Sequence, residues 1–252
     1  MHLERQANVN MTESKILLFI VEGKSDEASL APALEQIVDK TTKFKVIQSD
    51  ITSDFYSNPS NIERRIKKKG IKEFLSKNSQ FTEKDICGVV HIVDMDGAFA
   101  SDTLVQKDNT VENVIYEDDK ILETDDKYES FIKSRDNKRN NINALLKINS
   151  LKLKENHIVS YEMYFMSCNL DHVLHGKRNY TAEEKRLNSE KFASKYFEPQ
   201  KFIDFFNQDI IKIGDNYDDT WNYIKTDNNS LMRHSNLNIC IDKHKKKTIL
   251  DE

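Results

Sequence analysis

The sequence predicts an α/β fold in which a compact parallel sheet is flanked by helices and followed by a mainly helical C-terminal region. Two runs, 15–21 (KILLFIV) and 86–93 (ICGVVHIV), are continuously apolar, as in strands that are buried on both faces. A helix, a strand and a second helix are predicted between them, and this order favours parallel pairing. The chain has 252 residues, which is enough for a substantial core.

The elements between the two apolar runs follow from residue spacing. Residues 25–38 carry leucine and isoleucine at helical spacing, and Pro32 is expected to disturb the first turn. Residues 43–51 alternate as a strand does, and 61–76 place isoleucines on one side of a second helix. Together with the two apolar runs, these segments predict a doubly wound β-α-β-α-β unit.

Beyond residue 97 the pattern weakens. Residues 100–150 are polar and predict an insertion with a short strand at 111–116 and a short helix at 140–148. A last strand is expected at 158–166, and residues 181–210 have helical spacing.

These patterns divide the chain into three parts. They are an N-terminal tail at 1–13, an α/β domain at 14–176 and a mainly helical region at 177–252, whose last part from 235 has no clear pattern.

Charge and cysteine content restrict the class of protein. There are 38 Lys and Arg against 42 Asp and Glu, so any contact with nucleic acid has to come from a local patch or a metal ion. Three cysteines far apart indicate reduced thiols rather than a disulfide framework. No apolar run approaches the roughly 20 residues that span a bilayer, and the start has no apolar signal segment. We therefore expect a cytoplasmic protein that does not enter a membrane.

Three carboxylates stand at the ends of the two strongest strands. Glu22 ends the first, and Asp94 and Asp96 end the third, with a glycine after Glu22 and after Asp96. The carboxyl ends of parallel strands share one edge of a sheet, which is where open α/β folds bind ligands. Converging carboxylates repel one another unless a cation intervenes, and Mg²⁺ (or Mn²⁺) prefers such oxygen ligands. The alternative is that acids near a helix start only cap the helix, which accounts for Asp26 but not for the Asp94–Asp96 pair.

The segments 19–30 (FIVEGKSDEASL) and 91–99 (HIVDMDGAF) together resemble the TOPRIM domain. That fold occurs in topoisomerases, bacterial primases, overcoming-lysogenization-defect nucleases, small 5S-rRNA maturases and several phage-defence proteins. The resemblance covers residues 15–97 most clearly, and residues 177–252 match no family pattern. It implies Mg²⁺-dependent chemistry on phosphodiester bonds.

The resemblance also implies roles for individual residues. Glu22 would be a general acid/base or metal ligand, Asp94 and Asp96 would be catalytic metal ligands, and Asp26 would be an auxiliary ligand. Zinc-ribbon cysteines and a Gly-x-x-x-x-Gly-Lys loop are absent from the sequence, so an ATPase partner would be a separate chain. A small nuclease acting on DNA or RNA, such as a phage-defence effector, is the implied function. A regulatory partner and a homo-oligomer remain open.

Basic residues predict where nucleic acid would bind. Arg64, Arg65 and Lys68 belong to the densest basic cluster, and Lys24 directly follows Glu22 and Gly23. Such a cluster can follow a phosphate backbone. The alternative is a solvated helix face with glutamate partners, and for Lys24 a side chain that points to solvent.

The segment 167–176 (SCNLDHVLHG) follows the last expected strand. His172 and His175 are predicted to contact a phosphate or to relay a proton at the carboxylate site. Two alternatives stay open, which are a zinc site together with Cys168 and Asp171, and plain helix packing.

Two further functions are compatible with the same motifs. Residues 94–99 (DMDGAF) resemble the Asp-x-Asp-Gly-Thr motif of haloacid-dehalogenase-like phosphatases, although Ala98 replaces the threonine and the motif follows the third strand instead of the first. The other alternative is a TOPRIM-fold module that binds nucleic acid or a protein partner without turnover.

Overall fold

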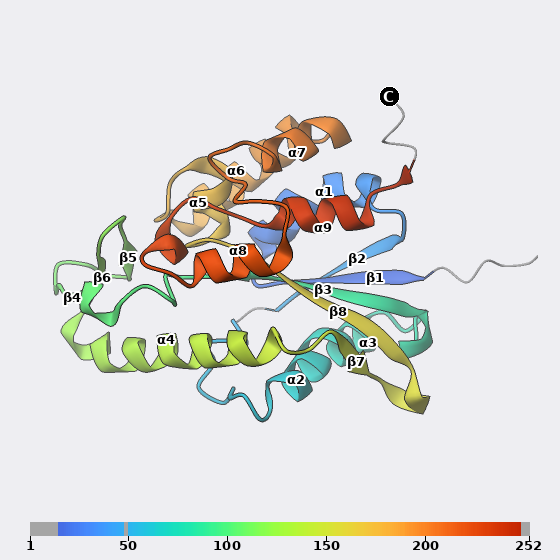
Figure 1. Cartoon of the computed structure of the whole chain (residues 1–252), viewed down its shortest axis with the longest axis horizontal. Helices are drawn as coiled ribbons and strands as arrows, with labels where there is room; N and C mark the ends of the chain where they lie inside the picture. Colours follow the sequence, from blue (N-terminus) through green and yellow to red (C-terminus); the bar gives the residue numbers. More distant parts are fainter. Residues whose placement is uncertain (1–14, 48–49, 248–252) are drawn as a thin grey trace, which may run out of the picture.

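A five-stranded, mainly parallel sheet forms the centre of the computed structural model, which describes residues 15–47 and 50–247 (Figure 1). The predicted tail at 1–13 therefore lies outside the described residues. The strand order is β2-β1-β3-β8-β7, and the predicted fold class is confirmed. The strands are β1 (Ile16–Val21), β2 (Thr41–Val46), β3 (Ile86–Asp94), β7 (Ser150–Lys152) and β8 (Ile158–Met166).

The register of the sheet places the carboxyl ends of four parallel strands at one edge. Val21 pairs with Val46 across β1 and β2, and Asp94 pairs with Met166 across β3 and β8. The edge strand β7 runs antiparallel to β8. Side chains that follow β1, β2, β3 and β8 therefore meet at this edge.

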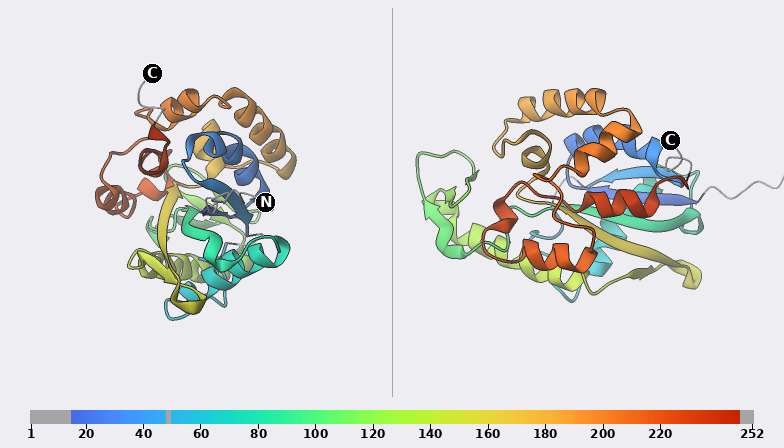
Figure 2. Two further views of the ribbon diagram at one scale, coloured as in Figure 1. Left: turned by 90° about the vertical axis from the view of Figure 1, so that its right-hand side faces the viewer. Right: turned by 45° about the horizontal axis from the view of Figure 1, so that its top comes forward.

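Helices cover both faces of the sheet (Figure 2). Alternate β1 residues point to opposite faces, so that Leu17 and Phe19 pack in one apolar core while Leu18 and Ile20 pack in the other. The first core is completed by α1 (Lys24–Ile37), α5 (Leu170–His175), α6 (Ala182–Lys195), α7 (Pro199–Phe206) and α9 (Leu237–His244). The second is completed by α2 (Ile62–Arg65), a π-helix η1 (Ile66–Lys72), α3 (Glu73–Lys77), α4 (Asp125–Leu145) and α8 (Tyr217–Ile224).

The first two predicted helices are present, each with a local departure. Helix α1 continues through Pro32, which lies well inside it, so the expected irregular first turn is not seen. The second helix contains the π-helical η1, where Gly70 lies directly on the sheet. A Cβ atom at Gly70 would meet Ile20 Cδ1 at 2.4 Å, so this close approach requires glycine.

The region 100–150 departs most from the prediction. The short helix expected at 140–148 is the end of the 21-residue helix α4. The strand expected at 111–116 is only β5 (Ile115–Tyr116), in a small sheet with β4 (Val105–Lys107) and β6 (Ile121–Glu123). Helix α4 escaped prediction because polar residues form much of its buried side, namely Arg135, Lys138 and Asn141.

The C-terminal region packs on the same core as the α/β domain. Phe202 and Leu237 belong to the apolar core that contains Leu17 and Phe19, and Ser235 bridges to Met166 at the end of β8. The patternless tail contains α9, and the strand expected at 43–51 ends at Val46, four residues before Asp50. Within residues 15–47 and 50–247, no helix combines the length and apolar character needed to cross a bilayer.

Candidate metal centre

The sheet brings the three predicted strand-end carboxylates together. Glu22 directly follows β1, Asp94 is the last residue of β3, and Asp96 lies two residues further on. Glu22 Oε1 accepts a hydrogen bond from the main-chain N–H of Asp94 at 3.2 Å, which ties the two strand ends to each other. The backbone then turns sharply, with φ of 46° at Asp96 and 61° at Gly97. A side chain at Gly97 would be strained at this φ and would also collide with Leu231.

Glu22, Asp50 and Asp96 form a compact group of possible metal ligands. One carboxylate oxygen from each lies within 4.8 Å of the other two. Hard oxygen donors of this kind are the ligands that Mg²⁺ and Mn²⁺ take, usually with water completing the shell. The donor set therefore fits a hard divalent cation, and these three residues would hold it.

Lys138 on α4 contributes the positive charge of this group. Its Nζ atom lies 2.9 Å from Asp50 Oδ2 and 2.5 Å from Asp96 Oδ2, and the residue is only 2% exposed. Burial alone would lower the pKa of Lys138, but Asp50, Asp96 and Glu22 outweigh burial and raise it well above its usual value. Lys138 therefore remains protonated and cannot accept a proton at neutral pH.

The carboxylates differ in how their charge is balanced. Burial, followed by the charge of Asp50, raises the pKa of Glu22. Burial and the charges of Asp26 and Asp96 raise the pKa of Asp94. The pKa of Asp50 is lowered although it is buried, because the charge of Lys138 and a hydrogen bond from Thr52 outweigh burial. The single positive charge of Lys138 thus does not balance all of these carboxylates, and a divalent cation would neutralise the remaining negative charge.

A second carboxylate group adjoins the first. Asp94 Oδ1 accepts the main-chain N–H of Leu170 at 2.9 Å, and the charge of Asp26 raises the pKa of Asp94. Asp171 on α5 pairs with Lys185 on α6 at 3.0 Å, and the charge of Lys185 reaches both Asp26 and Asp94. The predicted ligands Asp26 and Asp94 therefore lie outside the compact group of three.

Asp26 has a local structural role in addition. Its Oδ2 atom accepts the main-chain N–H of Gly23 at 2.9 Å, across the start of α1. This is the capping arrangement that the helix-start alternative anticipates. Burial raises the pKa of Asp26, and the Gly23 hydrogen bond offsets this only in part.

Among the described residues, neither predicted histidine forms a hydrogen bond or ion pair with Glu22, Asp94 or Asp96, although the charge of Asp171 acts on His175. Burial and the charges of Arg178 and Arg233 lower the pKa of His172 to about 4, and its Nδ1 atom is buried without a partner. His175 packs against the rings of Tyr180 and Phe192. In the part of the chain that the structure describes, no metal-sized ligand group draws on residues 167–176, so the zinc alternative gains no support.

The basic residues that were predicted to bind nucleic acid lie in three places. Arg65 Nη2 lies 2.5 Å from Asp54 Oδ2, and Asp54 follows Asp50 by four residues in the chain. Lys24 is exposed and lines a shallow pocket beside β2. The others line a groove of about 350 Å³, which we call the basic groove, formed by Arg64, Lys67, Lys68, Ile71, Lys72, Glu83, Lys152, Leu153 and Lys154.

Two residues of the site, Asp50 and Lys138, escaped sequence reasoning. Asp50 follows β2 at the same sheet edge, so an acid after the second parallel strand was a readable signal. Lys138 had none, because it reaches the site through a long-range contact, whereas Asp171 was named only as a member of the zinc alternative. Comparison of the chain with protein-family models, with curated proteins and with solved structures finds no match.

Proposed function

We propose that this chain is a Mg²⁺- or Mn²⁺-dependent nuclease of TOPRIM type that hydrolyses phosphodiester bonds of DNA or RNA. The observation that carries the proposal is the group formed by Glu22, Asp50 and Asp96 at the carboxyl edge of the parallel sheet. Open α/β folds bind ligands at this edge, and the motifs there are the ones that resemble the TOPRIM domain. A cytoplasmic location and a role in phage defence rest on that resemblance and on charge and cysteine content.

The residues of the site have complementary roles in this reaction. Glu22, Asp50 and Asp96 would hold the cation, which when bound supplies charge stabilisation at the phosphoryl group. Burial and the charge of Asp50 raise the pKa of Glu22, which favours proton uptake by this carboxylate when no cation is bound. Lys138 presents a fixed positive charge and, being protonated, serves as an electrostatic group rather than a base.

The basic groove supports a polyanionic substrate. Arg64, Lys68 and Lys72 repeat every four residues along the helix, and Lys152 and Lys154 join them from the far side. Among the described residues, none of these five has a carboxylate within ion-pair distance, so their charge is free to meet phosphates.

The phosphatase alternative fits the geometry less well. It requires Asp94 as an ionised nucleophile, but burial and the charges of Asp26 and Asp96 raise the pKa of Asp94 well above its usual value. Asp94 Oδ1 is also engaged by the main-chain N–H of Leu170. Both features disfavour attack by this carboxylate.

Substitution of the ligands tests the proposal. We expect Asp96→Asn and Glu22→Gln to abolish Mg²⁺-dependent cleavage in a screen of DNA, RNA and transfer RNA, with at least a hundredfold loss of rate of the order known for single electrostatic groups. Calorimetric titration of Mg²⁺ and Mn²⁺ should show saturable binding that each variant weakens. Asp209→Asn, which changes an exposed acid in another loop, is the matched control and should behave as wild type.

Each alternative predicts a different result in the same screen. Nucleic-acid binding without metal-dependent cleavage would point to a non-catalytic module. Release of phosphate from a small phosphomonoester, lost in Asp94→Asn, would point to the phosphatase. Cleavage that continues unchanged in folded Asp96→Asn protein would contradict the proposed mechanism.

A further inference from the structure

Two aromatic side chains stand exposed on the loop that carries Asp50. Phe55 and Tyr56 are 69% and 73% exposed, and they are the most exposed large hydrophobic residues in the described part of the chain. Large apolar rings in contact with water lose the stabilisation that burial would give them. Their place, five and six residues after a carboxylate of the candidate metal centre, calls for an explanation at that site.

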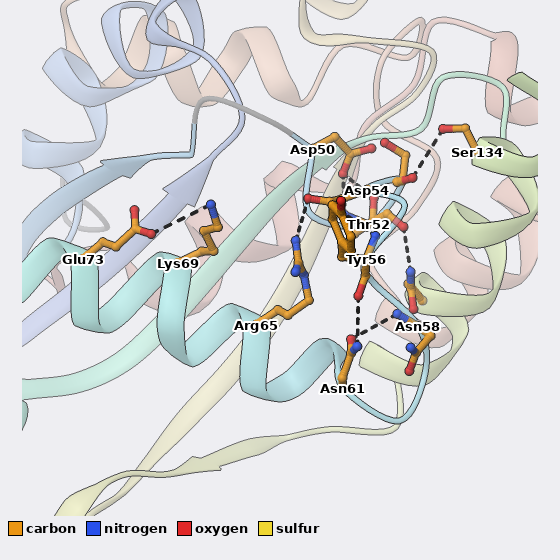
Figure 3. A network of polar contacts seen from close by, with 12 residues as sticks. Asp50, Thr52, Asp54, Tyr56, Asn58, Asn61, Arg65, Lys69, Glu73 and Ser134 are labelled. Atoms are coloured by element: carbon orange, nitrogen blue, oxygen red, sulfur yellow. Dashed lines mark hydrogen bonds and ion pairs between the residues drawn. The ribbon is translucent and has the colours of Figure 1, made fainter. Parts of the chain in front are cut away.

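Hydrogen bonds within the loop hold its main chain in place (Figure 3). Asp50 Oδ1 accepts the main-chain N–H of Thr52 at 2.7 Å, and Asp54 Oδ1 accepts that of Tyr56 at 2.7 Å. The carbonyl of Tyr56 accepts a hydrogen bond from the side chain of Asn61, directly before α2, at 3.0 Å. The main chain of this loop is therefore held in one conformation by its own hydrogen bonds.

Helix α4 braces the same loop from the other side. Asn141 donates to the carbonyl of Thr52 at 2.8 Å, and Ser134 donates to that of Ser53 at 3.4 Å. Lys138, between them on the same side of the helix, pairs with Asp50. The aromatic pair and the metal-ligand candidate Asp50 thus belong to one loop that α4 braces.

One lysine lies over the ring of Phe55. The centroids of Phe55 and Tyr56 are 5.4 Å apart and the rings are nearly perpendicular, at 86°. Lys133 Nζ lies 4.7 Å from the centre of the Phe55 ring, and among described residues it has no carboxylate within ion-pair distance. An aromatic face beside an unpaired cation is the combination that binds a base together with its phosphate.

We propose that Phe55 and Tyr56 form a stacking platform for an unpaired nucleobase, and that the substrate is single-stranded DNA or RNA. The inference rests on the proposed nuclease function and names its substrate class. In a duplex each base is stacked between its neighbours and its face is not available to a protein ring. The platform therefore favours single strands, or single-stranded loops and ends, over continuous duplex.

Binding measured without cleavage tests the platform. Fluorescence anisotropy is followed with labelled oligothymidylate, oligouridylate and a duplex of equal length, in EDTA and with wild-type and Asp96→Asn protein. We expect tighter binding of the single strands than of the duplex, and a loss of about tenfold or more in single-strand affinity for the Phe55→Ala/Tyr56→Ala variant. Phe55→Leu/Tyr56→Leu should lose as much, because leucine keeps apolar bulk but has no aromatic face. Phe55→Trp/Tyr56→Trp should keep the affinity.

Phe197→Ala is the matched control, because it removes a 54% exposed phenylalanine elsewhere on the surface. Single-strand affinity that is absent, that equals duplex affinity, or that falls as much in this control as in the platform variants would overturn the platform. Since both rings are exposed, the variants should keep the wild-type circular dichroism spectrum. Platform-dependent binding without metal-dependent cleavage would uphold the platform and reject the nuclease, whereas cleavage unaffected by the platform variants would do the reverse.

Discussion

At the scale of single residues, Lys138 is the side chain that supplies positive charge to the acidic centre. It is fully buried beside Asp50 and Asp96, and Glu22 adds a third negative charge. Such a lysine acts as an internal cation that lets the carboxylates approach one another in the folded chain. The same position makes Lys138 a competitor of a divalent ion for the carboxylate oxygens.

We therefore expect Lys138→Met to destabilise the metal-free protein by about 3–5 kcal/mol, because the buried carboxylates lose their partner. Added Mg²⁺ should recover part of this loss and raise the melting temperature of the variant more than that of wild type. Thermal unfolding in EDTA and in Mg²⁺ measures both effects. The control is Lys147→Met, which changes an exposed lysine just past α4. A Lys138→Met variant that is as stable as wild type in EDTA would contradict the prediction.

At the scale of elements, one carboxylate joins the C-terminal helix to the sheet. Glu162 on β8 lies 3.1 Å from His244 Nε2 and 3.3 Å from Lys243 Nζ, both at the end of α9. Tyr164 donates a further hydrogen bond to it at 2.8 Å. Burial alone would raise the pKa of Glu162, but these groups lower it to about 2.

This pKa predicts how α9 responds to acid. A carboxylate with a depressed pKa in the folded state stabilises the fold above its unfolded pKa near 4.5, and this stabilisation is lost as pH falls towards about 2. Glu162→Gln should lower the free energy of unfolding at pH 7 by roughly 1–2 kcal/mol, as loss of a charge-assisted hydrogen bond does. The difference from wild type should shrink below pH 4.5.

Denaturant unfolding at several pH values measures this difference. Glu190→Gln, which breaks an exposed pair within α6, is the control and should change stability by less than about 0.5 kcal/mol. A Glu162→Gln effect that stays constant from pH 7 to pH 3 would show that the charge of Glu162 is not what holds α9.

At the scale of the whole molecule, acidic and basic groups gather at opposite edges of the sheet. The carboxylates follow the carboxyl ends of the parallel strands, whereas Glu83, Lys152 and Lys154 of the basic groove lie just before the amino ends of β3 and β8. The helical segment that starts with α2 carries both Arg65, which pairs with Asp54 in the loop after Asp50, and Arg64, Lys68 and Lys72 of the basic groove. Although the net charge is -4, the molecule thus presents a local cationic surface.

The groove should contribute to nucleic-acid affinity through phosphate contacts alone. We expect Lys152→Ala/Lys154→Ala to weaken binding of all sequences alike and to reduce the slope of log affinity against log salt by roughly one per lost contact. Anisotropy titrations over a range of salt concentrations measure the slope. Mg²⁺ binding should not change, and Lys191→Ala/Lys195→Ala on α6 is the control. A slope of log affinity against log salt that is the same for the groove variant and this control would exclude the groove from the binding surface.

The sequence predicted the part of the site that depends on local signals. Long apolar runs specify buried strands wherever they occur, and an acid at the end of such a run reaches the sheet edge because the strand carries it there. This logic located Glu22, Asp94 and Asp96. It did not reach α4, because a helix that buries Arg135 and Lys138 has no apolar periodicity to recognise.

The sequence by itself determined the four parallel strands of the central sheet and the acidic edge, since periodicity and strand-end position are properties of neighbouring residues. Only the tertiary structure decided which acids form the compact group. It brought in Asp50, set Asp26 and Asp94 in the adjoining group, and placed Lys138 between Asp50 and Asp96. The physical reason is that a charge is balanced by whatever lies near it in space, and those neighbours come from distant parts of the chain.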